Sequence, residues 1–315
     1  MRAILDKRIG AALGIVAIAV FAVVGLSRSG DSQPAGTPAK LTIGIYTPTV
    51  LFSTSQARLA YVQGLAKAVE ANVGAKVEGR SYTSMSTLLR QDVDFGIIDA
   101  QCFAVNMNKG KLLANATIDG GTSRQWGLYS SVGPSMQALR GKKLAYIKMG
   151  CRDEQFLENA MLESEVDLGF FSGRVHKPDL SGTVAEVASR KGAEAVFAPV
   201  GSQKGLTKVF DTGSVPNPAF VQLNSKLSDN LVDKVRSAVT NYGGGGAISG
   251  WKAADVGDYR SLRARMATRV KEGVMAAPSP VGVDIKDLLI EPTTLKQTEL
   301  TAVKQHFLSP PDRQQ

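Results

Sequence analysis

The sequence is poor in the residues that carry most enzyme chemistry, with two cysteines and two histidines among 315 residues. It contains no His-Glu-x-x-His, Cys-x-x-Cys or Gly-x-Ser-x-Gly motif, and so lacks the signatures of zinc proteases, dithiol redox proteins and serine hydrolases. Lys and Arg never form a run longer than two, and they are not interleaved with aromatic residues as on nucleic-acid-binding surfaces. We therefore predict no catalytic or metal site, no cofactor and no nucleic-acid partner.

The rest of the composition is that of an ordinary folded protein, with 43% hydrophobic and 21% charged residues. The formal charge of +9 is spread along the chain, which is typical of a basic, solvated surface. The length is sufficient for one large or two medium domains with ample core.

The one long hydrophobic run lies at the start of the chain. Residues 9–26 are 18 uncharged, apolar residues, preceded by Arg2, Lys7 and Arg8 and followed by a Ser-, Gly- and Pro-rich stretch at 27–40. The positive charges place the amino terminus in the cytoplasm and all that follows the run on the other side of the membrane. The run is either an uncleaved membrane anchor or a cleaved signal peptide, and its length favours the anchor.

Strands and helices alternate along the exported part. The predicted elements of a first unit are strands at 40–45, 76–78 and 94–98 and helices at 55–72 and 83–90. Those of a second unit are strands at 143–147 and 194–198 and helices at 152–165 and 183–190. This alternation predicts an α/β fold with mainly parallel sheets, preceded by the apolar amino-terminal helix.

Three turns follow predicted strands at their carboxyl ends, which face the ligand-binding crevice in an open α/β sheet. The turn 46–55 is rich in Thr and Ser, 99–103 follows the strand 94–98, and 149–153 leads into a helix. We expect all three turns to line one cleft between two hinged halves. The candidate ligand-binding residues in these turns are Thr47, Thr49, Ser53, Gln101, Cys102, Gly150, Cys151 and Arg152.

Several short motifs occur in an order that resembles one known family. They are Leu89-Arg90 with Val93-Asp94 and the strand to Phe103, Leu139-Arg140-Gly141-Lys142-Lys143, Val215-Pro216-Asn217-Pro218 and Gly257-Asp258-Tyr259. Residues 41–265 resemble the periplasmic phosphonate-binding-protein-like family, the substrate-binding components of bacterial ABC importers. The resemblance implies a two-lobed type 2 periplasmic binding fold, with two crossover strands and a ligand in the cleft. It also places Tyr82 where the family has a ligand-contacting tyrosine.

The sequence departs from this family at ligand-facing positions. The family's Gly-Pro turn reads Asp99-Ala100 here, and its amine-facing aspartate corresponds to Pro199. Its Ser/Thr-rich anion loop corresponds to Gly150–Glu154, where the acidic residues Asp153 and Glu154 compete with an anionic ligand. We therefore do not expect a phosphonate that carries an amine, although Arg152 is suited to pair with a carboxylate or phosphate.

Some of these residues also have plain structural explanations. Tyr82 either binds a ligand oxygen or packs beside the sheet, and the hydroxyls of the turn 46–55 either face the cleft or cap the next helix. Cys102 and Cys151 are expected on opposite lobes of the cleft. They form a disulfide that hinders opening, remain separate buried thiols, or supply a thiol site for metal or redox chemistry.

The expected segments are a membrane-spanning segment at 1–26, a linker at 27–40, lobe one at 41–130 with 213–265, lobe two at 131–212, and an extension at 266–315 with one helix near 293–307. Two functions stay open. The first is a periplasmic solute-binding protein that closes around a small polar or anionic ligand and delivers it to an inner-membrane permease. The second is a membrane-anchored receptor or scaffold of the same fold that has lost transport and acts through a protein partner.

Overall fold

The computed structural model describes residues 40–163, 166, 168–203 and 205–268. The apolar run 9–26 and the helix expected near 293–307 lie outside these residues, so neither prediction is tested. Among the described helices, none combines the length and the apolar character needed to cross a membrane.

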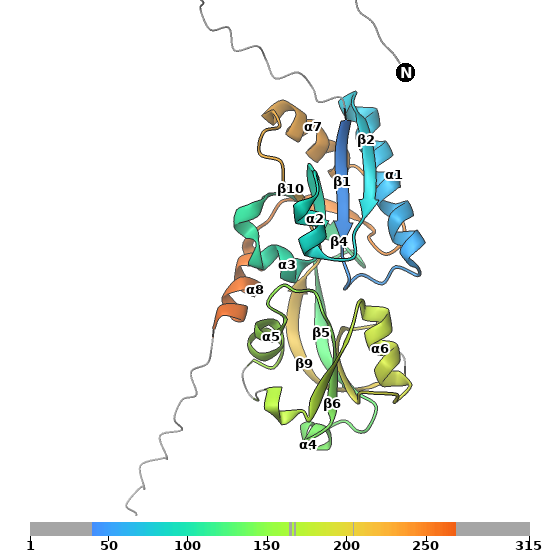
Figure 1. Ribbon diagram of the computed structural model, residues 1–315, viewed down its shortest axis with the longest axis vertical. Helices are drawn as coiled ribbons and strands as arrows, with labels where there is room; N and C mark the ends of the chain where they lie inside the picture. Colours follow the sequence, from blue (N-terminus) through green and yellow to red (C-terminus); the bar gives the residue numbers. More distant parts are fainter. Residues whose placement is uncertain (1–39, 164–165, 167, 204, 269–315) are drawn as a thin grey trace, which may run out of the picture.

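The upper lobe in Figure 1, lobe one, is built on a six-stranded sheet in the order β11-β4-β10-β3-β1-β2. Its strands are β1 (Lys40–Tyr46), β2 (Lys76–Ser81), β3 (Phe95–Ile98), β4 (Lys111–Thr117), β10 (Ala219–Gln222) and β11 (Gly250–Ala253). β1 runs parallel to both β2 and β3, whereas β10 is antiparallel to its neighbours β3 and β4.

Helices cover both faces of this sheet. One face packs against α1 (Ser55–Val73) and α7 (Asp229–Thr240), and the other against α2 (Met85–Arg90) and α3 (Ala100–Val105). α1 starts where the Thr54 hydroxyl accepts a hydrogen bond from the Ala57 amide, and it ends at Gly74, whose φ of 70° is the left-handed conformation of a helix C-cap. A short 3-10 helix, Met107–Lys109, leads into β4.

The lower lobe, lobe two, has a five-stranded sheet in the order β7-β6-β8-β5-β9. Its strands are β5 (Ser123–Ser130), β6 (Lys143–Ile147), β7 (Gly173–Lys177), β8 (Ala195–Pro199) and β9 (Thr207–Pro216). Its helices are α4 (Met136–Leu139), α5 (Asp153–Gln155) and α6 (Leu180–Ala188). α5 continues directly into a π-helical turn, Phe156–Met161, and a 3-10 turn, Leu168–Phe170, precedes β7. After β9 the chain returns to lobe one, where β10, α7 and β11 are followed by α8 (Gly257–Ala267).

The structure corrects three expectations. The sheets are mixed rather than mainly parallel, because β5 of lobe two runs antiparallel to both of its neighbours, β8 and β9, and β10 of lobe one runs antiparallel to β3 and β4. Residues 123–130 and 213–216, which were expected in lobe one, pair within the five-stranded sheet of lobe two as parts of β5 and β9. The helix expected at 152–165 is shorter, since its π-helical turn ends at Met161.

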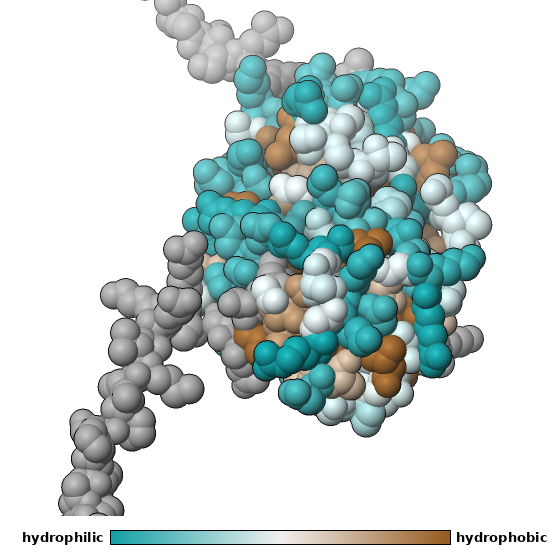
Figure 2. Space-filling model, turned by 60° about the horizontal axis from the view of Figure 1, so that its bottom comes forward, coloured by the Kyte–Doolittle hydropathy of each residue, from teal (hydrophilic) through white to brown (hydrophobic). Residues whose placement is uncertain are grey.

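Two apolar clusters form the interior. The first lies between the lobe-one sheet and α1 with α7. The second begins on the other face of that sheet, near Tyr82 and Leu88, and continues into lobe two through Trp126, Phe156 and Phe197. Because this second cluster is continuous, the lobes share one core across their boundary. The face shown in Figure 2 is mostly hydrophilic, and its apolar side chains form small separate patches.

Gly79 provides a test of how α1 packs on β2. A Cβ at Gly79 would lie 2.5 Å from the Val62 carbonyl oxygen of α1, so Gly79→Ala is expected to lower the free energy of unfolding by about 3 kcal/mol through overpacking. Gly173→Ala, in the edge strand β7, is the matched control, because the nearest atom to its Cβ would be 3.9 Å away. Denaturant unfolding followed by circular dichroism measures both. Equal stabilities of the two variants would contradict this packing.

Candidate functional site

The three turns expected to line one cleft do converge between the lobes. The Gln101 side chain at the start of α3 donates from Nε2 to the Cys151 carbonyl oxygen and to Asp153 Oδ1, both at 2.8 Å. The Tyr46 hydroxyl donates to the Met149 carbonyl oxygen at 3.4 Å. Elements after β1, β3 and β6 therefore meet at one seam.

A disulfide closes this seam. Cys102 in α3 and Cys151 before α5 are bonded, with their Cα atoms 5.0 Å apart, and both are buried. Of the three alternatives for these cysteines, the structure contains the cross-lobe bond, and no cysteine is free. The bond ties lobe one to lobe two beside the cleft.

Helix α8 holds the same side of the molecule together (Figure 1). It belongs to lobe one and packs on both α3 and the π-helical turn of lobe two. Arg265 Nη2 donates to the Ser214 carbonyl oxygen at 3.0 Å, and Asn159 Nδ2 donates to the Met266 carbonyl oxygen at 2.7 Å. The α3–α5–α8 edge is thus joined both covalently and by packing.

A buried polar network lies behind the first turn. Asp99 Oδ2 accepts hydrogen bonds from the Thr49 amide at 3.1 Å and the Thr49 hydroxyl at 2.6 Å. Arg124 of β5 donates to the Thr49 carbonyl oxygen at 3.3 Å and to Asn217 Oδ1 at 2.8 Å. Burial raises the pKa of Asp99, while the bonds from Thr49 and the charge of Arg124 act in the opposite direction. Thr49 thus contacts both Asp99 and Arg124, and the network joins β5 of lobe two to the lobe-one turn.

The centre of the cleft is nearly full. A cavity of about 20 Å³ remains there, lined mainly by apolar side chains that include Trp126, Phe156 and Phe197. Among the described residues, neither Trp126 Nε1 nor Gln101 Oε1 has a hydrogen-bond partner, and both residues line this cavity. This volume suits about one water molecule, so the central cavity has no room for a solute.

A larger cavity lies at the opposite edge of the cleft. It measures about 360 Å³ and is lined from both lobes, by the turn after β1 with the start of α1 and by the start of α6. Its polar lining includes Ser53, Thr54 and Arg58 from lobe one and Asp179 and Ser181 from lobe two. Next to it, the Leu180 amide of lobe two donates to the Pro48 carbonyl oxygen of lobe one at 2.9 Å.

The predicted site residues therefore occupy different surroundings. Thr47 and Ser53 line the outer cavity, and Thr49 and Gln101 line the central one. Gly150 and Arg152 are exposed and line neither of these two cavities.

Tyr82 is buried directly after the carboxyl end of β2 and lines neither of these two cavities. A Cβ at Gly44 would lie 2.8 Å from the Tyr82 ring, so the ring occupies the space that this glycine leaves open. Packing on Gly44 therefore explains the ring, whereas the Tyr82 hydroxyl is buried without a hydrogen-bond partner among the described residues, and its ligand role stays a prediction.

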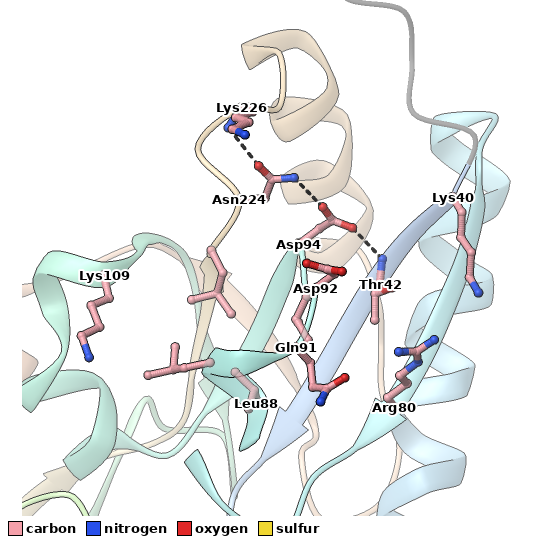
Figure 3. A pocket seen from close by; sticks show the side chains of 13 residues that line it. Lys40, Thr42, Arg80, Leu88, Gln91, Asp92, Asp94, Lys109, Asn224 and Lys226 are labelled. Atoms are coloured by element: carbon pink, nitrogen blue, oxygen red, sulfur yellow. Dashed lines mark hydrogen bonds between the residues drawn. The ribbon is translucent and has the colours of Figure 1, made fainter. Parts of the chain in front are cut away.

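A more voluminous hollow, about 840 Å³, is at the other end of lobe one (Figure 3). Asp94 stands at its centre, where its two oxygens accept from the Thr42 amide at 2.9 Å and from Asn224 Nδ2 at 2.7 Å. Lysines such as Lys109 and Lys226 surround it. This hollow lies at the amino ends of β1 and β3 and is lined by one lobe only, so we do not assign the ligand site to it.

Comparison with known proteins adds the fold. No family model and no curated protein matches the sequence. The binding protein component of an ABC phosphonate transporter from Pseudomonas aeruginosa aligns with a TM-score of 0.56 at 14% identity, covering 85% of this chain and 97% of that one. A Xanthomonas citri protein solved bound to ATP aligns with a TM-score of 0.56 at 13% identity, covering 72% and 97%. The chain has a type 2 periplasmic binding fold.

Within this periplasmic binding fold, sequence reasoning missed four residues that shape the cleft. Arg124 and Trp126 lie two and four residues before Leu128 in β5, so all three side chains point to the same face of the strand. Extending the predicted strand backwards from Leu128 would have placed both residues on that face. Arg58 lies four residues after the Thr54 cap, which places it in the first turn of α1. Asp99 lies in the predicted cleft turn 99–103, but its role as the buried acceptor that holds Thr49 was not predicted.

The disulfide can be tested directly. Replacing both cysteines, Cys102→Ser/Cys151→Ser, is expected to lower the free energy of unfolding by about 4 kcal/mol, because the bond joins residues 49 positions apart and restricts the unfolded chain. Denaturant unfolding of wild type and variant measures this loss. In the wild type, both thiols should react with a maleimide only after reduction in denaturant. Thiols that react without reduction, or a variant as stable as the wild type, would show that the bond does not form.

Proposed function

We propose that this protein is an extracytoplasmic solute-binding protein that holds a small polar or anionic ligand between its lobes for an ABC-type importer. The outer cavity is the observation that carries this proposal. Its volume of about 360 Å³ is within the range of small-molecule sites, and both lobes contribute hydroxyl groups to it. A ligand there contacts both lobes at once, as a two-lobed receptor requires.

Arg58 is the cation of this cavity, whose one carboxylate, Asp179, accepts from the Gly182 amide at the start of α6 at 2.8 Å. Its Nε donates to the Ser81 hydroxyl at 2.8 Å, which holds the side chain in place. In the part of the chain that the structure describes, no carboxylate forms an ion pair with Arg58. A held guanidinium without an acidic partner is suited to a carboxylate, phosphate or sulfonate group.

The fold similarity to the binding component of a phosphonate transporter supports a role in uptake. We also propose that residues 9–26 keep the protein at the periplasmic side of the cytoplasmic membrane, next to a permease. The basic residues before this run and its length support an uncleaved anchor, and a cleaved signal peptide leaves the same folded part in the periplasm.

A second candidate function is favoured by the tie between the lobes. The Cys102–Cys151 bond and the packing of α8 restrain opening at one edge of the cleft, and the central cavity is too small for a solute. A closed unit of this kind suits a membrane-anchored receptor or scaffold that acts through a protein partner. It differs from the first candidate in needing neither a ligand nor a lobe movement.

A thermal-shift screen tests the ligand site. With phosphate, phosphite, phosphonates, carboxylates and sulfonates, we expect one class to raise the melting temperature saturably, because a ligand that binds only the folded state stabilises it. Arg58→Gln should then weaken that ligand roughly tenfold to a hundredfold, since one charged contact is lost. Arg90→Gln, whose exposed guanidinium bonds only to Ser86, is the control and should leave affinity unchanged. Equal affinity in both variants would exclude the outer cavity as the site.

Tryptophan fluorescence separates the two candidates. The chain has two tryptophans, and Trp251 packs in lobe one against Tyr61, so Trp251→Phe leaves Trp126 as a reporter of the cleft. In a solute-binding protein, adding Cys102→Ser/Cys151→Ser should move the emission to longer wavelength as the lobes open and water reaches Trp126, and ligand should reverse the change. Emission that stays unchanged without the disulfide, with or without ligand, would favour the closed scaffold.

A further inference from the structure

The loop before α5 is wrapped around one of its own carboxylates. Asp153 Oδ2 accepts from the Met149 amide at 3.1 Å and the Gly150 amide at 2.9 Å, and Oδ1 accepts from the Cys151 amide at 3.4 Å. Gln101 of the other lobe donates to Oδ1 at 2.8 Å. Four donors from both lobes therefore converge on a single carboxylate.

The backbone of this loop is shaped to collect its amides at one point. Gly150 has φ of 72° and Arg152 has φ of 57°, so left-handed residues flank Cys151. Successive amides that alternate between right- and left-handed conformations form a concave nest that binds anions. A left-handed conformation costs a non-glycine residue conformational free energy, so the contacts of the surrounding loop must hold Arg152 in it.

We infer that Asp153 is a built-in anion that fills an oxyanion nest at the lobe seam and keeps external phosphate-like groups out of this loop. The amides that would receive such a group already donate to Asp153, and a second negative charge beside its carboxylate would be repelled. The unpartnered Gln101 Oε1 lines the adjacent central cavity as an acceptor and opposes an anion there as well. An anionic ligand would then bind in the outer cavity instead. This last consequence rests on the proposed function, whereas the role of Asp153 does not.

Asp153 is also positioned to stabilise the closed arrangement of the lobes. Its carboxylate orders the loop that presents the Cys151 carbonyl oxygen to Gln101 and the Cys151 sulfur to Cys102. An internal carboxylate performs this role permanently, whereas a bound solute would perform it only when present. The lobe seam therefore does not depend on an external anion.

Chemical rescue tests this inference. Asp153→Ala removes the carboxylate and leaves its space next to the central cavity, so its melting temperature should fall and formate or inorganic phosphate should restore it saturably. Asp153→Asn fills the same space without the charge, and should show no saturable response. The wild type should likewise show none. All chains carry Arg58→Gln, so that binding in the outer cavity does not contribute.

The outcomes are distinct from those of the ligand screen. The inference is supported if formate or phosphate restores the melting temperature of Asp153→Ala alone, or binds it with a dissociation constant at least about tenfold lower than that of the other two chains. Equal responses of the three chains to formate and phosphate would overturn it. If Asp153→Ala does not fold without added anion, Asp153→Ser, which keeps one short acceptor, provides the same comparison. A failed ligand screen with Arg58 intact would count against the proposed function only.

Discussion

The bond between Cys102 and Cys151 sets the relation of the two lobes, because it joins the start of α3 directly to the loop before α5. Gln101 strengthens the same seam by donating to the Cys151 carbonyl oxygen and to Asp153. The opposite edge of the cleft has no covalent bond between the lobes. There the Leu180 amide and the Pro48 carbonyl oxygen form one backbone hydrogen bond beside the outer cavity.

This arrangement divides the cleft into parts with different chemistry. The centre is filled by aromatic side chains from lobe two, and the charges nearest to it, Asp99 and Arg124, are satisfied through Thr49. The amides before α5 are taken by Asp153. Of the parts of the cleft described above, the outer cavity is the one lined by hydroxyls from both lobes and by the Arg58 guanidinium.

Elements with strong local signals could be predicted closely. The expected helix 55–72 is α1, whose Thr54 cap and Gly74 C-cap are visible in the sequence, and the expected strand 94–98 is β3. β4 and β11 were missed because their residues, such as the Leu-Ala-Asn-Ala of β4, have weak strand propensity. β4 forms a strand because it is hydrogen-bonded to β10 on one side and to β11 on the other. Both partners lie more than a hundred residues later in the sequence.

The α/β alternation and the polar turns at the carboxyl ends of β1, β3 and β6 could be predicted from the residues alone, because strand and helix periods are local properties. The sequence also puts one cysteine in each of two such turns. Three features became visible only in the folded molecule: the two thiols pair, β5 and β9 belong to lobe two, and Asp153 accepts from the amides of its own loop. Each of these features depends on which groups lie within bonding distance in the folded chain. Local sequence patterns around a residue do not show which partner it will meet there.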